Sequence, residues 1–147
     1  MNITTVGSAI YFAKELECYQ MQLYRDAAIL FPGNDQKMAC FNMEKECEKR
    51  ITLLSNVYED YTFSDMDAGI LSPIEVIDGS EYEIPEKAVL TDDMEMALKE
   101  VRDSFELGDR FYAVFLKRLE LGERSLSKRL KKIMERRTES RKSLTSF

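Results

Sequence analysis

The sequence predicts an all-α protein, an antiparallel bundle of four helices, and three observations lead to this fold class. Glycine and proline together number only nine in 147 residues, whereas Glu, Lys, Arg, Leu and Met, which favour helix, are abundant. Four segments repeat apolar residues every three or four positions, as amphipathic helices do. A long segment without this period separates the second helix from the third.

The first two helices are predicted over Val6–Phe31 and Asp35–Tyr61. The turn Pro32-Gly33-Asn34-Asp35 between them is so short that they should be antiparallel neighbours. The buried stripe of the first helix is Ala9, Phe12, Ala13, Leu16, Tyr19, Leu23, Ala27 and Leu30. The stripe of the second helix is Cys40, Met43, Cys47, Arg50, Leu54, Val57 and Tyr61.

Residues 62–90 should form a long crossover, because glycine and proline interrupt the helical period there. A short apolar run at Ile74–Ile77 could add a few extended residues. The third helix is predicted to open at Thr91, whose hydroxyl would cap it, and to end at Gly122. The fourth helix is predicted over Glu123–Ser143.

The chain is expected to form a single domain over residues 1–147. The segment Met1–Gly7 has no basic residue and is not a secretory signal, and no run of 18 apolar residues could span a membrane. The three cysteines are odd in number and scattered, which indicates reduced thiols. We therefore expect a cytoplasmic protein without a membrane partner.

The net charge of −6 is unevenly distributed, because the predicted fourth helix is basic. Residues 124–142 carry nine basic side chains against Glu135 and Glu139, so the rest of the chain is strongly acidic. The simplest interpretation is that acidic helices beside the basic one neutralise it. The alternative is a basic face for an acidic partner or nucleic acid, although the acidic remainder of the chain would repel phosphate.

The first two helices also carry a pattern of glutamate, tyrosine and leucine residues. In the first, Glu17 lies seven residues before Tyr24, and in the second the pair Leu53-Leu54 precedes Tyr58-Glu59. This pattern resembles the ferritin-like superfamily, and rubrerythrin-like proteins in particular. The order of two helices, a long crossover and two further helices is also ferritin-like. For an intact member, the resemblance implies a di-iron centre held by carboxylates and by two Glu-x-x-His motifs.

The ligand positions that the resemblance implies are mostly occupied by other residues, and the chain has no histidine. The segment Met43–Arg50 of the second helix matches Met134–Arg141 of the fourth in its Met, Glu and Arg residues. With Leu53-Leu54 setting the register of the second helix, this match that of the fourth and Tyr112 that of the third, the six positions are Glu17, Cys47, Arg50, Phe105, Thr138 and Arg141. Among them, only Glu17 is a carboxylate. An arginine repels a divalent cation and has no lone pair to offer. We therefore expect neither a metal nor another cofactor.

Arginines at ligand positions indicate what replaces the metal ions. Buried carboxylates that have lost their cations would be uncompensated, which is costly. Two guanidinium groups could restore the positive charge at mid-bundle. We therefore predict an ion-pair cluster, buried or half-buried, of Glu17, Glu48, Arg50, Glu139 and Arg141. In the alternative, the arginines reach outward into solvent.

Enzymatic chemistry is not expected from the remaining residues. A chain without histidine has no Ser–His–Asp or Cys–His arrangement, and it has no glycine-rich phosphate loop. Cys47 near Arg50 could be a thiolate, but core packing is the simpler interpretation. A carboxylate-only cation site is another possibility, with candidate ligands Glu44, Glu48, Glu106, Asp109, Glu135 and Glu139.

Three functional hypotheses follow. In the first, which we favour, the protein is a ferritin-like module that has lost its metal site and acts in a structural or regulatory interaction, as a homodimer or with a protein partner. In the second, it is a rubrerythrin-like oxidoreductase that binds iron or manganese at an altered carboxylate site. In the third, the basic fourth helix binds an acidic partner or nucleic acid.

Overall fold

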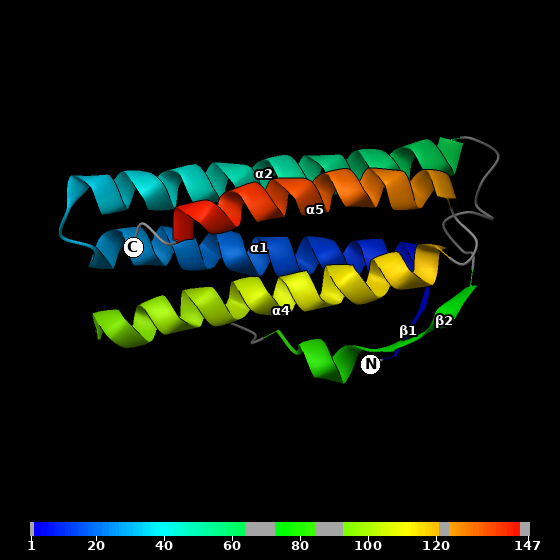
Figure 1. Cartoon of the computed structure of the whole chain (residues 1–147), viewed down its shortest axis with the longest axis horizontal. Coiled ribbons are helices and arrows are strands. Elements are labelled where there is room, and N and C mark those ends of the chain that lie inside the picture. Colours follow the sequence, from blue (N-terminus) through cyan, green and yellow to red (C-terminus); the bar gives the residue numbers. More distant parts are fainter. Residues whose placement is uncertain (1, 64–72, 85–92, 121–123, 145–147) are drawn as a thin grey trace.

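The computed structural model describes residues 2–63, 73–84, 93–120 and 124–144, and over these residues it confirms a mainly helical fold with four long helices (Figure 1). The helices are α1 (Val6–Leu30), α2 (Asn34–Phe63), α4 (Met94–Glu120) and α5 (Arg124–Leu144). Within this described part of the chain, no helix is both long enough and apolar enough to cross a membrane.

The four helices form a ring of neighbours. Helix α1 packs against α2 and α4, and α5 packs against the same two helices, so that α1 and α5 face each other across the centre. Figure 1 shows α1 and α5 running in one direction and α2 and α4 in the other, so each ring neighbour is antiparallel. Helix α2 ends where α1 begins, whereas α4 starts at the opposite end of the bundle. The intervening chain therefore has to travel the length of the bundle.

Local signals explain where the helices start and stop. The hydroxyl of Thr5 accepts a hydrogen bond from the Ser8 amide at 3.1 Å and caps α1. Asp93 does the same for α4, since its Oδ1 accepts from the Glu95 amide at 3.0 Å. The predicted cap, Thr91, lies outside the described residues.

A two-stranded antiparallel ribbon is an addition to the helical fold that the sequence predicted. Strand β1 (Asn2–Thr5) pairs with β2 (Pro73–Asp78), with Ile3 opposite Ile77. Strand β2 coincides with the apolar run in which extended residues were expected, whereas β1 was not predicted. A 3₁₀ turn, η1 (Gly79–Tyr82), follows β2. The ribbon buries Ile3 and Ile77 in the core.

The core consists of two apolar clusters, one towards each end of the bundle. The cluster at the ribbon end includes Leu16, Leu54 and Ile133. The cluster at the other end includes Leu23 and Phe105. On α1 and α2, buried polar side chains come between the two clusters, and on α5 they follow the residues of the ribbon-end cluster. They are Glu17 and Gln20 on α1, Arg50 on α2, and Arg137 and Ser140 on α5. We call this polar level, together with Cys47, Phe105, Asp109 and Tyr112, the mid-bundle layer.

Candidate functional site

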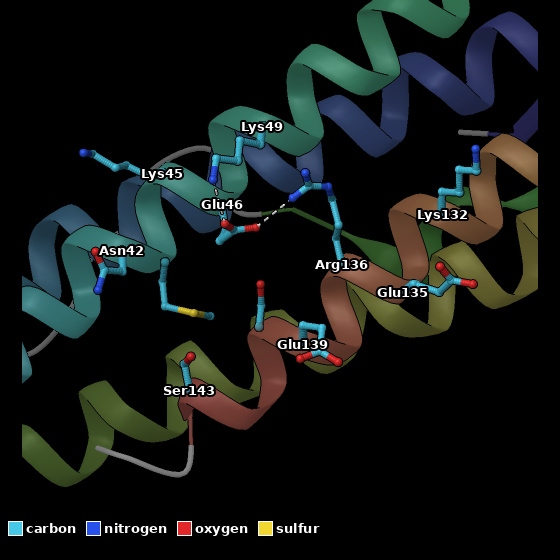
Figure 2. A pocket seen from close by; sticks show the side chains of 11 residues that line it. Asn42, Lys45, Glu46, Lys49, Lys132, Glu135, Arg136, Glu139 and Ser143 are labelled. Atoms are coloured by element: carbon cyan, nitrogen blue, oxygen red, sulfur yellow. Dashed lines mark hydrogen bonds and ion pairs between the residues drawn. The ribbon is translucent and has the colours of Figure 1, made fainter.

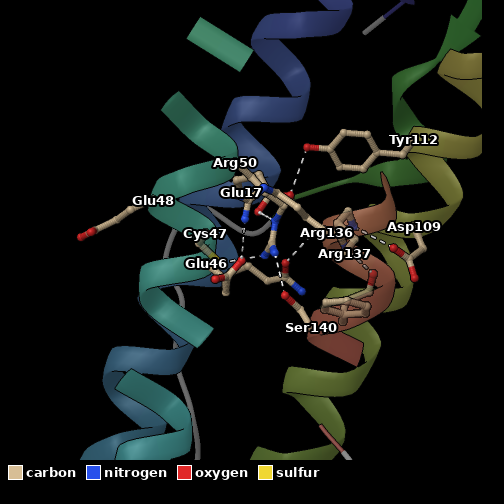
Figure 3. Close-up of polar contacts among 12 residues, drawn as sticks. Glu17, Glu46, Cys47, Glu48, Arg50, Asp109, Tyr112, Arg136, Arg137 and Ser140 are labelled. Carbon is tan, nitrogen blue, oxygen red and sulfur yellow. Dashed lines mark hydrogen bonds and ion pairs between the residues drawn. The ribbon is translucent and has the colours of Figure 1, made fainter. Parts of the chain in front are cut away.

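Glu17 is the centre of the mid-bundle layer and is completely buried. Its Oε2 accepts from Arg50 Nε at 2.8 Å. Its Oε1 accepts from Arg137 Nη1 at 2.6 Å and from the Tyr112 hydroxyl at 3.0 Å. A single carboxylate of α1 thus binds a side chain from each of the other three helices (Figure 3).

Arg50 extends the layer across α2 to α5. Its Nη1 donates to Ser140 Oγ at 3.0 Å, and its Nη2 donates to Cys47 Sγ at 3.3 Å. Burial acts most strongly against the charge of this guanidinium, but the groups beside it, Glu17 first among them, together outweigh burial and raise the pKa of Arg50 above its ordinary value. Arg50 therefore stays cationic although none of it is exposed.

Arg137 is the second buried arginine and is held from three sides. Its Nε donates to Asp109 Oδ1 at 2.7 Å, and its Nη2 donates to the carbonyl oxygen of Phe105 at 2.8 Å. The guanidinium carbon also lies 4.4 Å from the centre of the Phe105 ring and 5.0 Å from that of Tyr112. Gly108 leaves room for it, because a Cβ there would come within 2.5 Å of Arg137 Nη2.

The predicted cluster is therefore corrected in its second half. The structure brings Glu17 and Arg50 together, but the second arginine is Arg137 and not Arg141. Arg141 is 57% exposed and binds Asp109 at the rim of the layer. Glu139 pairs with Lys142 in solvent, and Glu48 is exposed near Arg25.

The six ligand positions implied by the ferritin-like resemblance divide in the same way. Glu17, Cys47, Arg50 and Phe105 lie in the mid-bundle layer. Thr138 is exposed, and its hydroxyl donates to the Met134 carbonyl of its own helix at 3.1 Å. The implied positions on α1, α2 and α4 thus lie in the layer, whereas the two on α5 lie outside it, and the arginine that α5 contributes comes one helical turn before Arg141.

The chemistry open to this layer is limited by its charges and its burial. Burial outweighs the nearby arginines and raises the pKa of the Cys47 thiol to about 12. Cys47 is therefore a protonated core side chain and not a thiolate at neutral pH. Among the residues that the structure describes, no three His, Cys, Asp or Glu side chains come together as metal ligands would. The six candidate ligands of a carboxylate-only site are not gathered, and Glu44, for example, pairs with Arg25.

A groove between α2 and α5 leads from the surface towards this layer (Figure 2). Its volume is about 870 Å³, and the buried side chains Met43 and Ser140 belong to its lining. The exposed part of the lining mixes both signs of charge: Lys45, Glu46, Lys49, Lys132, Glu135, Arg136 and Glu139. Glu46 bridges the two sides, since its carboxylate lies 3.2 Å from Lys49 Nζ and 3.6 Å from Arg136 Nη1.

Sequence reasoning missed Arg137, Gly108 and Gln20. A signal for Arg137 was present in the spacing of α5, because the buried Leu126, Leu130 and Ile133 are continued four residues later by position 137. For Gly108, the sequence carries no comparable sign, since its role depends on the helix that faces it.

Comparison of the chain with protein-family models, with curated proteins and with solved structures found no match in any of the three.

Proposed function

We propose that this protein is a ferritin-like bundle, related to rubrerythrin-like proteins, in which a salt-bridge cluster has taken the place of a di-iron site, and that it acts as a structural or regulatory interaction module. The observation that carries the proposal is the occupation of Glu17: both of its oxygens are taken by guanidinium groups, from Arg50 and Arg137. With three hydrogen bonds accepted and two guanidinium groups beside it, this carboxylate is a poor ligand for a metal ion.

The helix order supports the ferritin-like part of the proposal. The ferritin-like arrangement consists of two antiparallel pairs of helices, joined by a connection that runs the length of the bundle. The polar layer also lies where such bundles hold their metals, between side chains that project inward from all four helices. Two arginines supply positive charge at this level, as two metal ions would in an intact member.

Loss of the metal site leaves binding as the role that the remaining surface supports best. The α2–α5 groove is open and lined by cations and anions, and a protein with mixed charges would complement it better than nucleic acid would. Glu46, Glu135 and Glu139 would repel a phosphate backbone. We therefore propose a second copy of the chain, or another protein, as the partner at this groove.

Metal analysis tests the first half of the proposal. The protein is purified from cells supplied with iron and manganese, and the bound metal is measured by elemental analysis. We expect far less than one metal per chain, in the native protein and in Glu17→Gln alike. Stoichiometric iron or manganese that disappears in Glu17→Gln would instead establish the carboxylate-site oxidoreductase.

Light scattering after size exclusion tests the second half. We expect a dimer that the charge reversals Lys49→Glu and Lys132→Glu convert to monomer, because both lysines line the groove. Lys14→Glu on α1, outside the groove, is the matched control and should leave the dimer intact. The proposed interaction at the groove would be refuted by two results together. The native protein would stay monomeric at high concentration, and it would capture no partner whose binding depends on Lys49 and Lys132.

A further inference from the structure

Helix α1 carries less charge than the other three helices. Five of its 25 residues are charged, and one of these, Glu17, is buried, whereas eleven of the 21 residues of α5 are charged. Helix α1 also exposes two large apolar side chains, Tyr11 at 62% and Ile29 at 79%. Contact surfaces between proteins are depleted in charged residues and enriched in aromatic ones, so the outer face of α1 is a candidate for such a surface.

The exposed residues of α1 form one narrow stripe. From Tyr11 onward they are spaced by alternate steps of four and three residues, which keeps them on the side of the helix away from the core. We call them the α1 stripe: Tyr11, Glu15, Cys18, Gln22, Arg25 and Ile29. The steps are 4, 3, 4, 3 and 4, and they read the same from either end. A second copy of α1, laid antiparallel on the first, therefore matches the stripe residue for residue.

In this antiparallel register the stripe is complementary to itself. Tyr11 faces the partner's Ile29, so two exposed apolar side chains cover each other. Glu15 faces the partner's Arg25, which brings opposite charges together. Because the contact is isologous, each of these pairings occurs twice.

Other arrangements of two α1 helices lack this match. In a parallel pair with two-fold symmetry every residue faces its own copy, so Glu15 would meet Glu15 and Arg25 would meet Arg25. Shifting the antiparallel register by one turn in either direction sets Glu15 against Gln22 or against Ile29, and the ion pair is lost.

Arg25 can bind a second carboxylate. Its Nε already binds Glu44 on α2, and the carboxylate of Glu48 lies 4.0 Å from its Nη2. Its side chain is nevertheless 46% exposed. A guanidinium group has five N–H donors, so Glu44 can hold this one at the edge of the stripe while other donors remain for a carboxylate from outside.

We propose that the α1 stripe is a contact surface for a second copy of this chain, antiparallel to the first and related to it by a two-fold axis at the level of Gln20. The contact is separate from the α2–α5 groove and does not depend on it. One pair of helices makes a small interface, and exposed ion pairs add little to its stability. We therefore expect a weak dimer with a dissociation constant of about 1 mM, which the dilution on a size-exclusion column separates.

Cross-linking through Cys18 tests this contact. Cys18 is the exposed one of the three cysteines. It faces the partner's Gln22, so the two Cys18 residues would be offset by about 6 Å along the helices, within reach of a short bismaleimide. All proteins in the experiment carry Lys49→Glu and Lys132→Glu, which remove the groove contact, so the result is independent of the groove. In this parent protein, at about 1 mM, we expect a cross-linked dimer.

Two charge reversals decide whether the register is right. Glu15→Arg alone and Arg25→Glu alone each set like charges against each other at both symmetric positions, and each should lower the cross-linked fraction about tenfold. The two variants are complementary to each other, so their mixture should cross-link as the parent does. Isotopic labelling of one chain identifies this heterodimer by mass. Glu59→Arg, at an exposed glutamate of α2, is the matched control and should cross-link like the parent.

The reactivity of Cys18 itself has to be measured beside the cross-link. Burial, and after it Glu15, raise the pKa of Cys18, so each variant is also treated with a simple maleimide and its cross-linking is corrected for the rate. Absence of the cross-link in the parent, unchanged cross-linking in either charge reversal, or a mixture without heterodimer would overturn the antiparallel α1 contact.

Discussion

Replacing the central carboxylate tests the mid-bundle layer most directly. Glu17→Gln preserves the size of the side chain and removes its charge. The two buried arginines, Arg50 and Arg137, would lose the partner that lies 2.8 Å and 2.6 Å from their nitrogens. Removing one member of a buried ion pair typically costs about 3–5 kcal/mol. We expect a loss of about 4 kcal/mol, because the amide oxygen keeps one acceptor while Arg50 is left without a carboxylate partner and Arg137 keeps only Asp109.

A compensated variant shows whether this loss comes from unpaired charge or from shape. Glu17→Leu, Arg50→Met and Arg137→Met together remove all three charges and keep similar volumes. Apolar replacement of a whole buried cluster is commonly neutral, or stabilising by about 1–4 kcal/mol. We expect the triple variant to be as stable as the native chain or more stable, although it lacks every ion pair that Glu17 makes.

Urea unfolding followed by circular dichroism provides the measurement, through the midpoint and the slope of each transition. Glu139→Gln is the control, because this glutamate is 72% exposed and its pair with Lys142 contributes little. The reasoning fails if Glu17→Gln loses less than about 1 kcal/mol, or if the triple variant is less stable than Glu17→Gln.

Three further predictions concern the mid-bundle layer and the cysteines. Gly108→Ala should lower the free energy of unfolding measured in urea by about 1–3 kcal/mol, although alanine favours helix. The reason is that Arg137 is held by several partners and cannot yield to a new methyl group 2.5 Å from its Nη2. Adding Arg137→Met to this variant should restore stability. A thiol reagent added to the native protein should modify Cys18 quickly. It should modify Cys40 and Cys47 only when the protein unfolds, since these two are buried. Stability should fall as pH rises above about 9, by up to about 1.4 kcal/mol per pH unit for each buried thiol. The pKa of Cys47 is raised to about 12 in the folded state, so the stability that the protonated thiol contributes is fully present below its unfolded-state pKa and is lost as pH rises through its folded-state pKa. In a pH series of urea midpoints, Cys47→Ser should flatten this alkaline slope.

Helix positions could be predicted from the sequence because their signals are local. Apolar spacing and breakers placed the starts and ends of α1 and α2 within two residues of those observed. Strand β1 could not be predicted in this way. It is four residues long and forms because Ile3 finds Ile77 far along the chain, a pairing that no local pattern records.

The mid-bundle layer shows a similar limit. Arg50 could be proposed because it lies on the predicted stripe of the second helix, and Glu17 because it lies seven residues before Tyr24, as the ferritin-like pattern has it. Arg141 was chosen by matching α5 to α2, but a match of charged residues between amphipathic helices does not set the axial register. The apolar steps through Leu130 and Ile133 set it, and they place Arg137 inward and leave Arg141 outside.

The ribbon has a consequence for the order of folding. Contacts between α1 and α2 can form outward from the short turn that joins the two helices, whereas the pairing of β1 with β2 must wait until the chain has brought Ile3 and Ile77 together. A two-stranded ribbon is marginal by itself, so it needs the bundle surface beneath it. We expect the ribbon to assemble after the helices and to open before them. The backbone amides of α1 and α2 should therefore exchange with deuterium far more slowly than those of β1.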